Sequence, residues 1–233
     1  MNGEQLLKER LSRNWEQIET AARLKVSQPY LSLIEAGKRP VTEKLACRAV
    51  RVFNLSPTAL PVKLPSPAPP AASRSRPKNG EILASQLAAL GYPKFSHLKK
   101  TRKINPAAIL ISALKEDDLD SRLVEALPWL IFNFSDIDWT QVVNSAKLDD
   151  AQNRLGFLLS LARAIAQRAQ DENKTGLFRH LLSNLEKSRL LRDDSFQRNS
   201  MTESEKAWLR KNRPRRARDW RVLSNLSENH LIY

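Results

Sequence analysis

Apolar positions near the N-terminus recur at the spacing of short helices. Leu7 and Leu11 lie four residues apart, so both are expected on the inner face of a first helix. The segment EQIETAARL predicts a second helix, in which Ala21 is small enough for another helix to approach closely. Residues 1 to about 61 therefore indicate a bundle of short helices.

The segment VSQPYLSLIEAGKR predicts a third helix. Ser27 is expected to cap its first turn, because a hydroxyl can accept a hydrogen bond from a backbone amide. Pro29 falls in that turn, where its missing N–H costs little. Leu31 and Ile34 are placed on the inward face, and Gly37 is expected to end the helix.

Two further elements complete this first domain, residues 1–61. The segment VTEKLACRAVRVF predicts a fourth helix capped by Thr42, and SPTALP predicts a fifth, short helical turn. Residues 61–80 then hold six prolines and four cations, and the prolines exclude a continuous helix or a central strand. We therefore predict a basic, proline-rich linker over residues 62–80.

Residues 81–233 return to a helical pattern. Caps and stops delimit helices at NPAAILISALKED, DLDSRLVEALPWLI and DDAQNRLGFLLSLARAIAQRA. The most strand-like run, WLIFNF, is better explained as the end of a buried helix. In the last of the three segments, apolar residues at helical spacing predict one apolar stripe: Leu155, Leu158, Leu159, Ala162 and Ile165. The patterns together predict an all-α protein.

Composition adds a preference for an anionic partner. The 233 residues carry a net charge of +14, with an isoelectric point of about 10.2, which is typical of proteins that bind nucleic acid. The excess is shared by residues 1–62 (+4), 63–80 (+4) and 81–233 (+6), so no single segment is a basic domain. A solvated basic surface is the alternative explanation.

The sequence offers little for other kinds of chemistry. Cys47 is the one cysteine and the three histidines lie far apart, so neither a metal site nor an internal disulfide is expected. No apolar run approaches the length of a membrane span, and the charged start MNGEQLLKERL lacks the apolar block of a signal peptide. We therefore expect a cytoplasmic protein without a metal or a cofactor.

From Trp15 to Arg39 the sequence WEQIETAARLKVSQPYLSLIEAGKR resembles, without a gap, the helix-turn-helix of Cro/C1-type repressors, the XRE family. The flanking helices extend this resemblance over residues 4–60. It implies a five-helix, lambda-repressor-like domain that binds double-stranded DNA. Its recognition helix, here residues 27–36, would enter the major groove with its N-terminal residues toward the base edges.

This resemblance assigns base contacts to the third helix. Gln28 can form a bidentate pair with adenine, worth roughly 1–3 kcal/mol of discrimination between bases. Ser27, Tyr30 and Ser32 carry polar groups that can reach bases or phosphates.

Other residues are expected on the phosphates. Gln17 matches the family position that holds a phosphate across the groove. Lys38 and Arg39 follow the helix in a loop, where phosphate contacts fix register without reading sequence. Lys25 stands where the family favours glycine; it costs about 1 kcal/mol if the turn needs positive φ, and it offers a further phosphate contact.

Four positions depart from the family pattern. Glu16 stands where Ser or Thr usually caps the second helix, and its charge would repel phosphate. Thr20 replaces an apolar core residue, while Ile18 occupies a position that is usually charged. Leu33, at a common base-reading position, can pack on a thymine methyl but makes no polar pair. These departures predict a less stable domain with narrower polar readout.

Residues 138–162 resemble the C-terminal helical part of abortive-infection-type antitoxins, through the RLGFLL element from Arg154 to Leu159. Such antitoxins are encoded beside a nucleotidyltransferase toxin, so the resemblance implies a toxin partner for residues 81–233. The alternative is an ordinary core helix in a domain for dimerisation or effector binding.

The remaining polar clusters have simple interpretations. Three acid pairs stand near predicted helix ends and are explained as solvated caps: Asp117/Asp118, Asp149/Asp150 and Asp193/Asp194. Residues 210–221, RKNRPRRARDWR, hold seven cations against one acid, either as a clamp for DNA or an acidic partner or as a solvated surface. Trp208 and Trp220 are expected to anchor this stretch.

The sequence therefore predicts a transcriptional regulator of repressor type, without enzymatic activity, that binds DNA as a homodimer. The alternative is an antitoxin that neutralises a toxin through residues 81–233 and regulates its own operon through the N-terminal domain.

Overall fold

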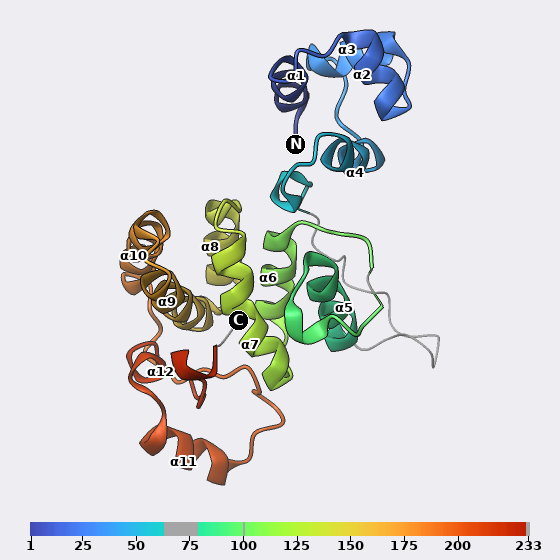
Figure 1. The fold of residues 1–233 in the computed structure, drawn as a ribbon. Coiled ribbons are helices and arrows are strands. Elements are labelled where there is room, and N and C mark those ends of the chain that lie inside the picture. The colour runs from blue at the N-terminus through green and yellow to red at the C-terminus, as the bar shows by residue number, and fades with distance from the viewer. Residues whose placement is uncertain (63–78, 100, 232–233) are drawn as a thin grey trace. The chain divides into compact units, whose positions relative to one another are not determined.

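The computed structural model describes residues 1–62, 79–99 and 101–231, and it divides the chain into two compact units, residues 1–63 and 64–233 (Figure 1). Regular structure in the described residues is helical, with only isolated β-bridges besides. The predicted all-α fold is confirmed. The predicted linker lies outside the described residues, except for Val62 at its start and, at its end, Asn79 and Gly80, which already belong to the first helix of unit 2.

Unit 1 holds the five predicted helical segments. They are α1 (Gly3–Leu11), α2 (Gln17–Leu24), α3 (Gln28–Glu35), α4 (Glu43–Val52) and the 3-10 helix η1 (Pro57–Ala59). The fifth segment is thus a single 3-10 turn and not an α-helix. The core is apolar and closed to solvent, and its largest members are Leu6, Leu24, Leu31, Ile34 and Phe53.

The inner face of α1 differs from the predicted one. Leu6 is fully buried, Leu7 is half-buried and Leu11 is 56% exposed. Leu6 and Arg10, four residues apart, form the face of α1 that is turned toward the core and α3, so Leu7 and Leu11 lie one position off that face. The spacing of Leu7 and Leu11 identified the helix but placed its face wrongly.

Two predicted helix boundaries are confirmed. The hydroxyl of Thr42 accepts a hydrogen bond from the Leu45 backbone N–H at 3.3 Å and caps α4. Gly37 follows the C-cap of α3 with a φ of 71°, a conformation in which any side chain would be strained. The loop that carries Lys38 and Arg39 therefore leaves α3 at a fixed point.

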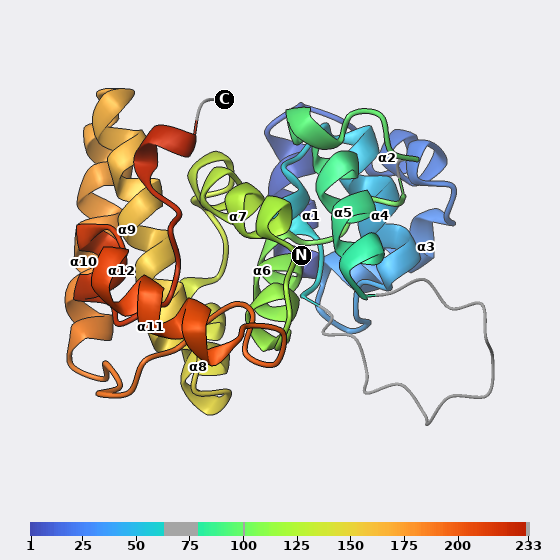
Figure 2. The same ribbon diagram turned by 90° about the horizontal axis from the view of Figure 1, so that it is seen from below.

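Unit 2 is built around one central helix. Its elements are α5 (Asn79–Leu90), η2 (Pro93–Phe95), α6 (Pro106–Lys115), α7 (Ser121–Asn133), α8 (Trp139–Leu148), α9 (Gln152–Arg168), α10 (Glu172–Glu186), α11 (Glu203–Asn212), α12 (Arg215–Asp219) and η3 (Glu228–His230). Helix α9 packs against α7, α8, α10 and α12, and Figures 1 and 2 both show α10 alongside it. The WLIFNF run falls at the end of α7, as predicted.

Burial of α9 extends beyond the predicted stripe. Leu155, Leu158, Leu159 and Ala162 are fully buried, as expected. The other residues from Gln152 to Leu161 are buried as well, including an arginine and an asparagine. The RLGFLL element is therefore enclosed on every side, because neighbouring helices and the C-terminal segment cover it all round.

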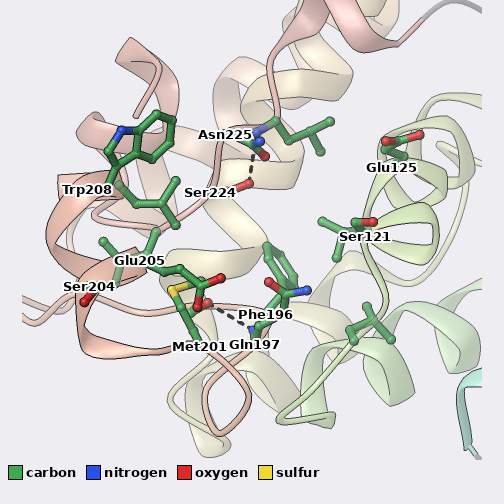
Figure 3. A pocket seen from close by; sticks show the side chains of 16 residues that line it. Ser121, Glu125, Phe196, Gln197, Met201, Ser204, Glu205, Trp208, Ser224 and Asn225 are labelled. Atoms are coloured by element: carbon green, nitrogen blue, oxygen red, sulfur yellow. Dashed lines mark hydrogen bonds between the residues drawn. The ribbon is translucent and has the colours of Figure 1, made fainter. Parts of the chain in front are cut away.

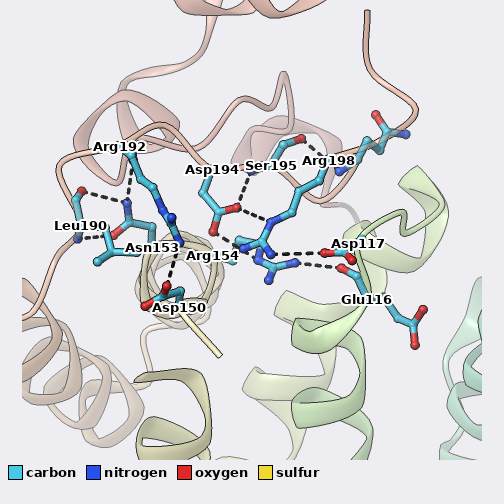
Figure 4. A network of polar contacts seen from close by, with 11 residues as sticks. Glu116, Asp117, Asp150, Asn153, Arg154, Leu190, Arg192, Asp194, Ser195 and Arg198 are labelled. Atoms are coloured by element: carbon cyan, nitrogen blue, oxygen red, sulfur yellow. Dashed lines mark hydrogen bonds and ion pairs between the residues drawn. The ribbon is translucent and has the colours of Figure 1, made fainter. Parts of the chain in front are cut away.

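The buried arginine, Arg154, organises the polar interior of unit 2 (Figure 4). Its side chain is 1% exposed and forms an ion pair with Asp194 at 3.3 Å, and its Nη1 donates to the Glu116 carbonyl at 2.9 Å. Arg198 approaches Asp194 from the other side at 3.0 Å. Burial lowers the pKa of Arg154 from its ordinary value, and the Asp194 carboxylate opposes that change.

The side-chain amide of Asn153, the neighbour of Arg154, bonds the backbone N–H and C=O of Leu190, as a neighbouring strand would (Figure 4). Its Oδ1 accepts from the Leu190 N–H at 2.9 Å, and its Nδ2 donates to the Leu190 carbonyl at 3.0 Å. Together with Arg154, this amide fastens the loop after α10 to the centre of the unit. Two consecutive polar residues on one buried helix thus hold irregular chain in place.

The interpretation as solvated caps fails for two of the three acid pairs, whereas Asp149 lies at the C-cap of α8 and Asp150 is exposed, each with one ion pair. Asp194 is 7% exposed, Asp193 forms ion pairs with Arg210 and Arg213, and Asp118 accepts from two backbone N–H groups at residues 199–200. Those backbone bonds lower the pKa of Asp118. The acids hold loops against the helices, which spacing along the chain could not reveal.

Much of the positive charge of the basic stretch, residues 210–221, is paired within unit 2. Most of its arginines contact acids or carbonyls of unit 2: Arg210 and Arg213 with Asp193, Arg215 with Asp219, Arg216 with Glu228, and Arg221 with the Leu191 carbonyl. Trp220 is 5% exposed and anchors the stretch as predicted, whereas Trp208 is 58% exposed and does not.

Gly156 explains how Trp220 reaches the central helix. A Cβ placed on Gly156 would lie 2.2 Å from the Trp220 ring, closer than any real contact. We expect Gly156→Ala to push Trp220 and the chain after it away from α9, at about 1–3 kcal/mol of unfolding free energy. Thermal unfolding, with hydrogen exchange of peptides from residues 217–231, measures both effects.

Gly176→Ala is the matched control, because nothing lies within 4 Å of a Cβ built on this α10 glycine. Alanine there should leave stability unchanged or raise it by up to about 1 kcal/mol. Equal stability of the two variants would contradict the packing of Trp220 on α9.

Candidate nucleic-acid interface

Helices α2 and α3 pack against each other through apolar residues of the unit 1 core. Lys25 turns the chain between them with φ 54° and ψ 50°, so the turn does need positive φ and the predicted cost of about 1 kcal/mol applies. Arg48 of α4 donates to the carbonyls of Leu24 and Lys25, each at 3.1 Å. This guanidinium gives hydrogen bonds to two carbonyls at the end of α2 and so supports the strained turn at Lys25.

The leading end of α3 carries the predicted base-reading residues. Ser27 is exposed, and Gln28, Tyr30 and Ser32 are half-exposed. Tyr30 also packs against the unit 1 core, so its ring is positioned by apolar contact and only part of it faces outward. Polar groups therefore do gather at the start of this helix.

The predicted cap by Ser27 is wrong. Ser27 occupies the N-cap position with an extended backbone, but its hydroxyl accepts no hydrogen bond from the helix. Pro29 stands at the second helical position and has no N–H, which removes one of the two donors that a capping hydroxyl uses. The Ser27 hydroxyl therefore contributes no capping bond to α3.

Gln28 is held by a chain of side chains that begins on α1. Its Nε2 donates to Oε1 of Gln17 at 2.5 Å, and Nε2 of Gln17 donates to Oε2 of Glu35 at 2.8 Å. Arg10 grips the same carboxylate through two bonds, of 2.8 and 3.1 Å, and donates to the Trp15 carbonyl at 3.0 Å. We call these four residues, Arg10, Glu35, Gln17 and Gln28, the glutamine relay.

The Arg10–Glu35 pair of the relay is mostly shielded from water. The side chain of Glu35 is 5% exposed and that of Arg10 is 13% exposed. A charge-assisted, bidentate pair in such a place is strong, and breaking it leaves an uncompensated charge. The relay therefore fixes the direction of the Gln28 amide and leaves its oxygen and one N–H unused within the relay.

Sequence reasoning missed half of this relay. Gln17 and Gln28 were predicted site residues, and the structure joins them by a hydrogen bond. Arg10 and Glu35 are 25 residues apart and lie on different helices, so no local pattern pairs them. The one available signal is that Glu35 belongs to the motif on which the family resemblance was drawn.

The predicted phosphate contacts lie at the ends of α2 and α3. Lys25, Lys38 and Arg39 are exposed, the first at the turn and the others after Gly37. The Arg39 guanidinium carbon lies 5.8 Å from the Tyr30 ring centroid, at the outer limit of a cation–π contact. Cations thus stand before and after the recognition helix.

The departures from the family pattern have clear places in the structure. Thr20 is fully buried, and its hydroxyl donates to the Glu16 carbonyl at 2.8 Å, which satisfies it. Ile18 is 70% exposed and Leu33 is 37% exposed. Glu16 is the N-cap residue of α2 without a capping bond, as expected from its length. These residues explain a less apolar core and a partly apolar outer face.

Unit 2 contains a mostly apolar cavity of about 540 Å³ between α7, α11 and the segments around Phe196 and Leu223 (Figure 3). Figure 3 shows Trp208, Met201 and Phe196 around it, with Ser121 and Glu125 on the α7 side. In the described part of the chain, no group of three or more His, Cys, Asp or Glu is arranged to hold a metal. No helix there is long and apolar enough to cross a membrane.

Residues 6–60 match a family model described as Helix-turn-helix. The match covers the residues on which the resemblance to Cro/C1-type repressors was drawn, so that assignment is confirmed for the N-terminal domain. No curated protein and no solved structure matches the chain. The antitoxin resemblance of residues 138–162 stays a prediction.

The relay generates a stability prediction. Glu35→Gln removes the buried ion pair with Arg10 and should lower the unfolding free energy of unit 1 by about 3 kcal/mol. Hydrogen exchange of peptides from residues 1–60 in the full chain measures this unit separately from unit 2.

Glu19→Gln is the control, because its pair with Arg23 has side chains 45% and 49% exposed. Such an exposed i,i+4 pair contributes less than about 0.5 kcal/mol. If both variants changed exchange equally, Glu35 would not anchor the domain.

Proposed function

We propose that this protein is a sequence-specific transcriptional regulator of repressor type that reads the major groove with α3. The observation that carries the proposal is the glutamine relay. An amide held in one direction has lost its rotamer freedom before it meets a base, so less entropy is lost on binding. Glutamine is also the side chain whose amide matches adenine bidentately in the major groove.

The exposed cations give this reading helix its register. Lys25 lies at the N-terminal side of α3, and Lys38 and Arg39 lie just past its C-terminal side. Contacts from both sides to phosphates would set the depth and angle of the helix in the groove. Such contacts add affinity without sequence preference, and they depend on salt.

A repressor of this kind is expected to act as a homodimer on a pseudo-palindromic operator. Half-sites would lie about 34 Å apart, one turn of the duplex. Unit 2 is the candidate for self-association, and the protein would act in the cytoplasm, where its DNA lies. We assign no catalytic reaction to either unit, because the acid pairs of unit 2 are engaged in ion pairs and backbone bonds.

The alternative function, an antitoxin with a toxin partner, requires a different surface from the one that suggested it. Arg154 and Gly156 are buried, and their contacts with Asp194 and Trp220 account for their presence by packing alone. A toxin would therefore have to bind elsewhere on unit 2.

The first test concerns base reading. Gln28→Ala should relax the preference at one base pair of each half-site, with a loss of roughly 5- to 150-fold in discrimination, as expected for one bidentate pair. Selection of bound duplexes from a random oligonucleotide pool measures it.

Gln167→Ala, on an exposed position of α9, is the control and should select the same sequences as the unchanged protein. An unaltered preference in Gln28→Ala would remove Gln28 from base readout and leave the relay a purely structural role.

The second test concerns the phosphates. Replacing Lys38 with Ala should weaken binding to all duplexes by a similar factor and reduce the slope of log affinity against log salt by about 0.9. Titrations at several salt concentrations measure the slope, and Arg39→Ala should behave alike.

Lys147→Ala removes the same charge from an exposed site on α8 in unit 2. A similar loss of slope in that variant would mean that overall charge, and not a contact at Lys38, attracts DNA.

A further inference from the structure

A cavity of about 520 Å³ in unit 2 gathers arginines from segments far apart in the sequence. Arg163 comes from α9, Arg179 from α10, Arg189 from the loop that follows α10, and Arg216 from α12. This cavity is separate from the apolar one next to Trp208, because the two share no lining residue. We call it the arginine cavity.

Two of these arginines have no polar partner in the described part of unit 2. Among the residues that the structure describes, Arg163 and Arg179 form no ion pair and no hydrogen bond. The Nε of Arg163 is buried as well as unpartnered. A buried charged donor without a partner costs free energy, so its presence calls for an explanation such as a bound anion.

The other two arginines are fixed in position by the unit itself. Arg189 donates to the Asp219 carbonyl at 2.6 Å, and Arg216 pairs with Glu228 at 3.3 Å. Each guanidinium has five N–H groups, so these contacts orient the side chains and leave donors over. The cavity is therefore lined by two guanidinium groups with polar partners in the fold, Arg189 and Arg216, and two without, Arg163 and Arg179.

The charge of the lining favours an anion with several charges. Two acids, Glu186 and Asp219, also line the cavity, so four positive groups face two negative ones. The Asp219 carboxylate is shared with Arg215, at 4.0 Å and at an exposed site. The net positive charge remains, and Glu186 offers an acceptor for hydroxyl or amino groups of a ligand.

We propose that the arginine cavity binds a small organic phosphate with at least two phosphate groups. Guanidinium groups match phosphate oxygens bidentately. The volume lies within the range of small-molecule sites, roughly 300–1,000 Å³. This site goes beyond the proposed DNA-binding function, because it lies in unit 2 and uses no residue of α3.

Isothermal titration of the full chain with ATP and, separately, with inorganic pyrophosphate tests the proposal in the absence of DNA. One equivalent of ATP should bind, and Arg163→Gln and Arg179→Gln should each weaken it at least tenfold. Arg163→Gln removes no hydrogen bond, so it should unfold at the same temperature as the unchanged protein. At one ATP concentration, the unfolding temperature should rise more for the unchanged protein than for Arg163→Gln.

Arg122→Gln is the matched control, since Arg122 is an exposed arginine of α7 outside the cavity. It should bind ATP as the unchanged protein does. An equal loss in Arg122→Gln would show that net charge alone attracts the anion and would overturn the proposal. Binding of pyrophosphate but not of ATP would overturn the organic part of the assignment.

A third outcome separates this site from the DNA interface. If no ATP bound and Arg163→Gln instead weakened duplex binding, the cavity would be a DNA contact and the proposal would be wrong. Because the titration contains no DNA, failure of ATP binding leaves the base-reading role of Gln28 untouched, and the reverse also holds.

Discussion

The carboxylate of Glu35 connects the first helix of the chain to the helix that would read DNA. The Glu35 side chain is 5% exposed, and Arg10 and Gln17 bond both of its oxygens, which offsets the cost of burying it. The same bonds orient the Gln17 amide, and Gln17 orients Gln28. Stability of the domain and direction of the reading side chain therefore depend on one interaction.

This dependence has a consequence for how the domain tolerates its weak points. A strained lysine at the turn, an uncapped second helix and an uncapped third helix all reduce stability. The buried pair offsets some of that loss, and Arg48 closes the end of α2 through two carbonyls. The positions that depart from the family pattern are thus supported from α1 and α4, outside the helix-turn-helix itself.

Much of this fold could be predicted from the sequence because its signals are local. Thr42, Gly37 and Pro29 mark helix ends through the chemistry of their own backbones, and each lies where it was predicted. The Arg10–Glu35 pair of the glutamine relay and the Arg154–Asp194 pair could not be predicted, since each joins residues 25 or more positions apart on different elements. Only packing brings such charges together.

The sequence pattern also predicted the solvent exposure of some side chains wrongly. Leu11 and Trp208 looked like core and anchor residues, yet both face solvent, because an apolar side chain is buried only if a neighbouring element covers it. The helix that contains Arg154 erred in the opposite direction. Only one apolar stripe was predicted for it, but the residues from Gln152 to Leu161 outside that stripe are buried as well, because α7, α10 and the C-terminal elements cover them.

Two arginines of α9 show why burial of charge alone does not identify a ligand site. Arg154 is the more buried of the two, but it forms an ion pair with Asp194 and donates to the Glu116 carbonyl, so the fold neutralises its charge even though its Nε makes no hydrogen bond. Arg163, nine residues further along the same helix, has a buried Nε and no partner among the described residues. An unpaired buried donor lowers stability, so the fold gives no reason to keep one at this position. Arg163 has no ion pair and lies beside a cavity that three other arginines line, so it is evidence for a ligand. Arg154, which is paired with Asp194, is not.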